Sequence, residues 1–159
     1  MYSFRNDYSE GAHPKVLQAL ADTNLRQTVG YGMDPCCQAA ADTIRRLCAA
    51  PDAAVHFLVG GTQVNLVTID AFLQSYEAVV AAQTGHVSTH ETGAIEATGH
   101  KVCTVESPDG KLTPALVESV LAGHNGTEHM VLPRMVYISD TTEIGTVYTW
   151  AELAALRQC

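Results

Sequence analysis

Short apolar runs alternate with helical stretches along this chain, and that alternation limits the folds it can adopt more than any other feature. Compact runs of apolar and β-branched residues predict buried strands at 55–59, 77–82, 101–105 and 134–139. Helical patterns are found at 14–25, 34–49, 62–74, 89–97 and 113–121, and a last helix is expected after Thr149. Strands separated by helices are typical of βαβ units, so we predict an α/β fold with a mostly parallel sheet flanked by helices.

Three of the predicted helices begin with a capping signal. Asp34 precedes Pro35, so a carboxylate can accept from the first free N–H groups while proline takes the first helical position. Thr113 precedes a proline in the same arrangement. Thr149 stands three residues before Glu152, which is the spacing of a capping box. Each signal predicts the start of a helix.

Composition excludes several classes of function. The net charge of -8 argues against a protein that binds nucleic acid or an anionic membrane, and no apolar run approaches the roughly 20 residues of a membrane-spanning helix. Only 16% of residues are charged, against about 25% in typical domains, so we expect part of the surface to be covered by a subunit or by more polypeptide. Five cysteines without paired spacing, and no secretory signal, favour a reducing, cytoplasmic compartment.

A glycine turn at a predicted strand-to-helix junction is the first candidate for a binding site. Gly60 and Gly61 let a ligand approach the backbone, and Thr62 opens the following helix. The hydroxyl and the free N–H groups of a helix start can hold a phosphate, and the helix dipole favours the anion. The turn lacks the lysine of a Walker loop. A plain glycine turn, or a non-catalytic phosphate- or nucleotide-binding module, is the alternative.

The segment 85–94 is the second candidate, because it follows the run 77–82 and so lies at the carboxyl end of a strand, where open α/β sheets bind ligands. The ring of His86 or His90 could stack on a flat cofactor there. These histidines and Glu91 lack the His-Glu-x-x-His pattern and a clear third ligand, so we do not predict a metal site. The alternative is a histidine that only makes hydrogen bonds within its loop.

Two further segments are weaker candidates. Residues 139–148 follow another predicted strand and could face the same ligand edge, or they could form a solvated loop. Cys36 and Cys37 lie in the first turn of a predicted helix, where the dipole can lower the pKa of a thiol. No base partner for either cysteine can be placed from the sequence.

Four segments follow one another in an order that a known family shares. They are Phe4-Arg5-Asn6-Asp7, Tyr31-Gly32-Met33-Asp34-Pro35, the run 57–65 and the run 142–148. In this order they resemble motifs of the low-specificity threonine aldolases and β-eliminating lyases, which are fold-type I enzymes that use pyridoxal 5′-phosphate (PLP). Asn6 replaces a serine of the family pattern. The resemblance implies that residues 1–159 are the N-terminal segment and part of the large PLP-binding domain of an aspartate-aminotransferase-like enzyme.

The resemblance also implies roles for individual residues. The cofactor-binding residues would be Gly61, Thr62, Gln63, His86 and Glu91, with Gly61 and Thr62 on the cofactor phosphate. His86 would stack on the pyridine ring and act in proton transfer, which makes it the expected catalytic residue, and Glu91 would orient it. Asn6 and Tyr31 would lie near the substrate or in the site of a neighbouring subunit.

The implied activity is cleavage of a β-hydroxy-α-amino acid, threonine or allo-threonine, into glycine and acetaldehyde. The family is oligomeric, so a homodimer or homotetramer that acts on small amino-acid substrates is expected. Another PLP-dependent lyase reaction, transamination, and a degenerate non-catalytic subunit are alternatives.

The lysines set a limit on what these residues can do alone. Lys15, Lys101 and Lys111 are the only ones, and none matches the lysine that carries the cofactor in the family. We therefore expect a truncated protein, in which the remainder of the catalytic domain and the C-terminal small domain are absent. Negligible turnover by these 159 residues alone is expected.

Overall fold

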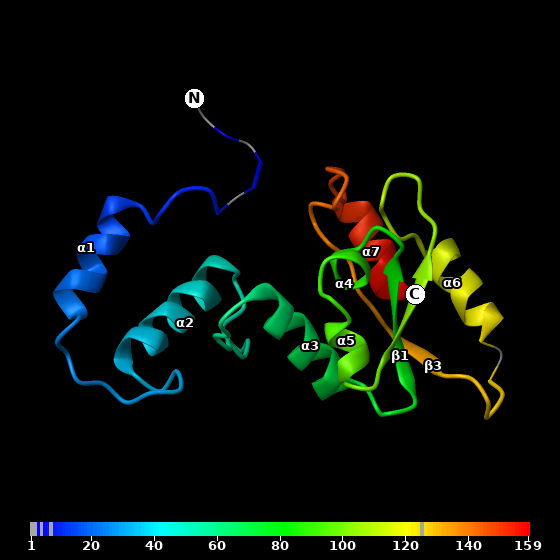
Figure 1. Cartoon of the computed structure of the whole chain (residues 1–159), viewed down its shortest axis with the longest axis horizontal. Helices are drawn as coiled ribbons and strands as arrows, with labels where there is room; N and C mark the ends of the chain where they lie inside the picture. The colour runs from blue at the N-terminus through cyan, green and yellow to red at the C-terminus, as the bar shows by residue number, and fades with distance from the viewer. Residues whose placement is uncertain (1–2, 4, 7, 125) are drawn as a thin grey trace. The chain divides into compact units, whose positions relative to one another are not determined.

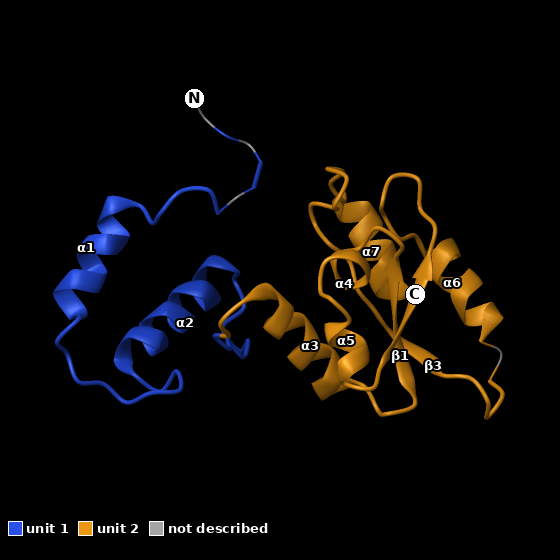
Figure 2. Ribbon diagram, in the orientation of Figure 1, with its two compact units in different colours: residues 1–57 blue, residues 58–159 orange. Residues whose placement is uncertain are grey.

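The chain divides into two compact units, residues 1–57 and 58–159 (Figure 2). This computed structural model describes residues 3, 5–6, 8–124 and 126–159. The assignment of the whole chain to the large PLP-binding domain stays a prediction.

The described part of the first unit contains two helices, and both begin where the sequence predicts. In α1 (Pro14–Thr23), the ring nitrogen Nδ1 of His13 accepts a hydrogen bond from the first turn. In α2 (Pro35–Leu47), the carboxylate of Asp34 accepts hydrogen bonds from two N–H groups of the first turn, at 2.8 and 3.0 Å. The cap at Asp34 is therefore confirmed.

A parallel three-stranded sheet with the order β2-β1-β3 forms the centre of the second unit (Figure 1). Its strands are β1 (Glu77–Ala82), β2 (Lys101–Val105) and β3 (Leu132–Val136). All residues of β1 after Glu77 are buried, because this strand has a neighbour on each edge and helices on each face. A strand buried on both faces is a continuous apolar run, which is why the sequence pattern located it. The predicted parallel α/β fold is confirmed.

Helices cover both faces of the sheet. They are α3 (Gly61–Phe72), α4 (His86–Thr89), α5 (Ala94–Ala97), α6 (Pro114–Gly123) and α7 (Trp150–Gln158). On one face, Val79 of β1 shares a core with Ile69 of α3 and Ile95 of α5. On the other face, Val80 of β1 packs in a second core with Val117 of α6. Among the described residues, no helix is long and apolar enough to cross a membrane.

The caps of the last two helices follow the sequence signals. The hydroxyl of Thr113 accepts a hydrogen bond from the N–H of Leu116 at the start of α6. At the start of α7, Thr149 and Glu152 form a reciprocal capping box. Both predicted helix starts are confirmed.

The predicted strand at 55–59 is wrong. These residues belong to no strand, and Phe57, Leu58 and Val59 are 47%, 39% and 93% exposed. An apolar run becomes a strand only when a neighbouring strand accepts its hydrogen bonds, and the described residues supply none. The run predicted at 134–139 is a strand, although it occupies 132–136.

The single helix predicted at 89–97 is also wrong, because two four-residue helices replace it. α4 ends at Thr89 and α5 begins at Ala94. Between them, Thr92 and Gly93 have φ angles of 54° and 74°, in the left-handed region. Two consecutive residues in the left-handed region interrupt the helical hydrogen bonds, so α4 and α5 are separate helices.

Candidate active site

The carboxyl end of β1 places the first functional side chain. After Ala82 the chain turns, and the N–H of Gly85 donates to the carbonyl of Ala82 at 2.8 Å. A Cβ atom on Gly85 would stand 3.0 Å from that carbonyl oxygen, so the close turn favours glycine. α4 starts at the next residue, His86, which therefore lies at the carboxyl end of the central strand, as the sequence predicts.

His86 is joined to a buried carboxylate. Its Nδ1 lies 2.8 Å from Oε1 of Glu91, whose side chain is fully buried, while the His86 side chain is 39% exposed. Asn65 of α3 donates its amide N–H to the same Oε1 atom. The other oxygen of Glu91, Oε2, is buried and has no hydrogen-bond partner within the part of the chain that the structure describes. The site thus holds one satisfied and one unsatisfied carboxylate oxygen.

The backbone beside Glu91 is strained. Thr92 is β-branched, and residues of that type adopt φ values near 54° only when the surrounding structure holds them there. Such a conformation costs about 1–3 kcal/mol. Thr92 directly follows Glu91, whose carboxylate reaches the ring of His86 five residues earlier in the chain.

The start of α3 is open toward an anion. The N–H groups of Gly61, Thr62 and Gln63 have no acceptor among the described residues, as is usual for the first turn of a helix. A Cβ built on Gly60 or Gly61 would meet no atom within 4 Å, so the space in front of this turn is free. The side chain of Gln63 bends back and accepts from the N–H of Val59 at 3.0 Å.

These residues fit a flat cofactor that carries a phosphate. The first turn of α3 offers unpaired N–H groups and the positive end of the helix dipole, which suit a phosphate. The half-exposed imidazole of His86 offers a face for stacking. The two features are connected, because Asn65 lies one helical turn after Gly61 and contacts Glu91.

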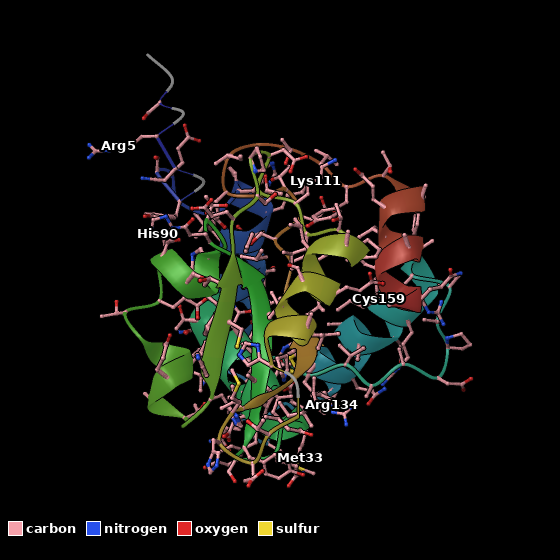
Figure 3. The ribbon with its side chains drawn as sticks, turned by 90° about the vertical axis from the view of Figure 1, so that its right-hand side faces the viewer. Arg5, Met33, His90, Lys111, Arg134 and Cys159 are labelled. Carbon is pink, nitrogen blue, oxygen red and sulfur yellow. The ribbon has the colours of Figure 1, made fainter. Side chains whose placement is uncertain are left out.

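A second histidine stands beside the first. The ring of His90, which is labelled in Figure 3, lies edge-on to that of His86 with 5.6 Å between the ring centres. His90 is exposed and follows the last residue of α4. Only His86 is held by the buried carboxylate, so His86 is the histidine with a fixed orientation.

The predicted substrate residues belong to the first unit. Asn6 accepts local hydrogen bonds from the N–H of Tyr8 and the hydroxyl of Ser9. Tyr31 is fully exposed and has a φ of 63°. Their role with substrate stays a prediction, and Phe4 and Asp7 of the same motif lie outside the described residues.

The position of Cys37 at the start of α2 does not lower the pKa of its thiol. A hydrogen bond with the Asp34 carboxylate is the main reason that the pKa of Cys37 lies above its ordinary value. The expected effect of the helix dipole on this pKa is therefore wrong for Cys37, since the capping carboxylate outweighs it.

The segment 139–148 is a loop in which Thr142 and Tyr148 are buried, while most of its other residues are exposed to solvent. Tyr148 is buried, and its hydroxyl oxygen accepts from the N–H of Leu112 at 2.6 Å. Burial raises the pKa of Tyr148 above its ordinary value. The hydroxyls of Thr142 and Thr146 are 2.7 Å apart, and Thr146 also donates to the carbonyl of Asp109. The loop after β3 is thus fixed to the loop after β2.

Sequence reasoning missed Asn65 as a member of the site. It was visible only as the last residue of the run 57–65, and it lies 26 positions before Glu91 in the sequence. The signal that could have found it is its position one helical turn after Gly61, on the helix that opens at the glycine turn.

Known proteins resemble this chain over nearly all its length. The β-eliminating lyase family matches residues 4–159. Low-specificity L-threonine aldolases from a Pseudomonas species and from Pseudomonas aeruginosa are 36% and 35% identical over 155 residues, which is 96% of this chain and 44% of each relative. A solved threonine aldolase structure from Leishmania major is 56% identical, with a TM-score of 0.95 over 99% of this chain and 46% of its own.

The resemblance inferred from the four sequence segments is therefore confirmed, and so is the fold. The chain spans about half the length of the curated relatives that it matches. The match across residues 4–159 and the shared fold show that the chain belongs to the family of β-eliminating lyases.

Proposed function

We propose that the protein containing this chain cleaves threonine or allo-threonine into glycine and acetaldehyde with the help of pyridoxal 5′-phosphate. The observation that carries the proposal is His86, held by a buried carboxylate at the carboxyl end of the central strand, in a fold shared with a threonine aldolase. When bound, the conjugated ring of the cofactor accepts the electrons left on the substrate α-carbon as the Cα–Cβ bond breaks.

Each site residue has a distinct task in this proposal. The N–H groups of Gly61 and Thr62, with the Thr62 hydroxyl and Gln63, bind the phosphate at the start of α3. His86 stacks on the ring with its imidazole face. Its Nε2 accepts the proton of the substrate β-hydroxyl group, since Nδ1 is engaged by Glu91.

The lysine that holds the cofactor comes, in this proposal, from outside these 159 residues. Lys111 is engaged elsewhere, because its Nζ lies 3.0 Å from both carboxylate oxygens of Glu152. Lys101 begins β2 at the sheet edge, and Lys15 belongs to the first unit. The relatives are about twice as long, which leaves room for such a lysine.

We also propose a homodimer or homotetramer in the cytoplasm. Many large apolar side chains are exposed in this chain; in α1 alone, Val16, Leu17 and Leu20 are 51%, 54% and 61% exposed. Further polypeptide or a second subunit would cover them. All five cysteines are free, which suits a reducing compartment.

A product assay on the full-length protein tests the proposed reaction. We expect equal amounts of glycine and acetaldehyde from threonine or allo-threonine, and a decrease of about 10²–10⁴-fold in kcat for His86→Asn. His129→Asn is the matched control, since the side chain of His129 is 84% exposed and remote from the proposed chemistry. Release of ammonia and a keto acid instead would assign a β-elimination. Absence of both products and of cofactor binding would leave a non-catalytic module.

A further inference from the structure

We propose that Asn65 is a positioning residue, which acts through Glu91 to hold His86 in one tautomer with Nε2 free to accept a proton. The inference rests on the proposed function for its consequence in catalysis, but its physical content can be measured without catalysis. Three described side chains carry it, and they come from α3, from α4 and from the strained turn after α4.

The tautomer follows from the chemistry of the shared acceptor. Oε1 of an ionised carboxylate can only accept hydrogen bonds, so both neighbours must point a donor at it. For Asn65 the donor is the amide N–H, and for His86 it is Nδ1–H. A neutral imidazole has one donor and one acceptor nitrogen. The arrangement therefore places the proton on Nδ1 and leaves the lone pair on Nε2.

Asn65 is needed because little else holds the carboxylate in place. Oε2 of Glu91 has no partner in the described ranges, so both of its side-chain hydrogen bonds converge on Oε1. Without Asn65, the half-exposed His86 would be the one remaining side-chain contact of the carboxylate among the described residues. The carboxylate would then turn to satisfy its buried oxygens, and Nδ1 would lose its fixed acceptor.

The position of Asn65 also connects the two halves of the proposed site. It lies one turn after Gly61 on the same helix, so the turn proposed to bind phosphate and the support of His86 belong to one rigid element. Supports of this kind matter: removing the hydrogen-bond partner of a metal-bound histidine lowers affinity or activity by roughly 10- to 100-fold. We expect a decrease of the same order in kcat for Asn65→Ala, with little change in KM for the amino acid.

Nitrogen-15 NMR of the histidine-labelled full-length protein tests the proposal directly. The signals of His86 are identified by their loss in His86→Gln. In the wild type we expect His86 as the Nδ1–H tautomer. In Asn65→Ala, and in the similarly sized Asn65→Leu that preserves packing, we expect a mixture of both tautomers, as in Glu91→Ala. Gln158→Ala, which removes an exposed amide at the end of α7, is the control and should match the wild type.

The two proposals fail in different ways. If His86 keeps one tautomer in folded Asn65→Ala and Asn65→Leu, while Glu91→Ala mixes the two, the role of Asn65 is overturned whatever the enzyme does. If the tautomer shifts as expected but the wild type cleaves no β-hydroxy amino acid, the positioning role stands and the proposed reaction fails.

Discussion

The hydrogen bond between the Tyr148 hydroxyl and the backbone of Leu112 should contribute measurably to stability. Tyr148→Phe keeps the ring, and with it the contact of Lys111 Nζ 5.5 Å from the ring centre. It removes the acceptor of an N–H group on a residue that is only 2% exposed. A buried N–H without a partner costs about 1–3 kcal/mol, so we expect a loss of about 2 kcal/mol in the free energy of unfolding.

Urea unfolding, followed by circular dichroism, measures this loss. For a slope of about 2 kcal/mol per molar urea, the midpoint should fall by about 1 M in Tyr148→Phe. Tyr137→Phe is the matched control, because the hydroxyl of Tyr137 takes part in only a long 3.4 Å contact from Ser139. That control should stay within about 0.5 kcal/mol of the wild type. Equal midpoints for the two variants would refute the reasoning.

Three more predictions concern strain, close packing and charge. Thr92→Gly should raise the free energy of unfolding by about 1 kcal/mol, because glycine adopts the left-handed φ of this position without the strain of an exposed β-branched side chain. Thermal unfolding measures the change, and a lower melting temperature would contradict it. Gly85→Ala should lower the urea midpoint by an amount equivalent to about 1–3 kcal/mol, since its Cβ would stand 3.0 Å from the carbonyl oxygen of Ala82; an unchanged midpoint would show that the turn can widen freely. Hydrogen bonds from the N–H of Thr149 and from Lys111 lower the pKa of Glu152 from 4.5 to about 2, so its ionised form stabilises the fold above pH 4.5 and that contribution is lost as the pH falls toward 2. The urea midpoint of Glu152→Gln should therefore lie below that of the wild type at neutral pH and approach it in acid, and a difference that stays constant with pH would exclude this origin.

Local patterns in the sequence predicted those elements whose signals are themselves local. The bounds of β1 and β2 agree with the predicted runs, since both are short apolar segments between polar turns. The caps at Asp34, Thr113 and Thr149 each depend on residues within three positions of one another, and all three are present.

The errors and omissions arise from contacts between distant residues. The run 55–59 has the composition of a strand, but pairing needs a neighbour that local composition does not reveal. The break after α4 depends on a left-handed threonine, which propensity disfavours and tertiary structure imposes at Thr92. The hydrogen bond between Asn65 and Glu91 joins two segments that no local pattern relates. Of the site, the sequence located His86 and the start of α3, and the fold alone supplied the contact that links them.

The central place of β1 has a consequence for the newly made chain on the ribosome. β1 pairs with β2 on one edge and with β3 on the other, and Glu77 stands opposite Leu132. At about 5–20 residues per second, synthesis from the first of these residues to the second takes roughly 3–10 s. During that interval the apolar strand has one open edge, which any other extended segment could occupy. A chaperone that binds short apolar segments would be expected to act on residues 77–82 in this interval, before β3 closes the sheet.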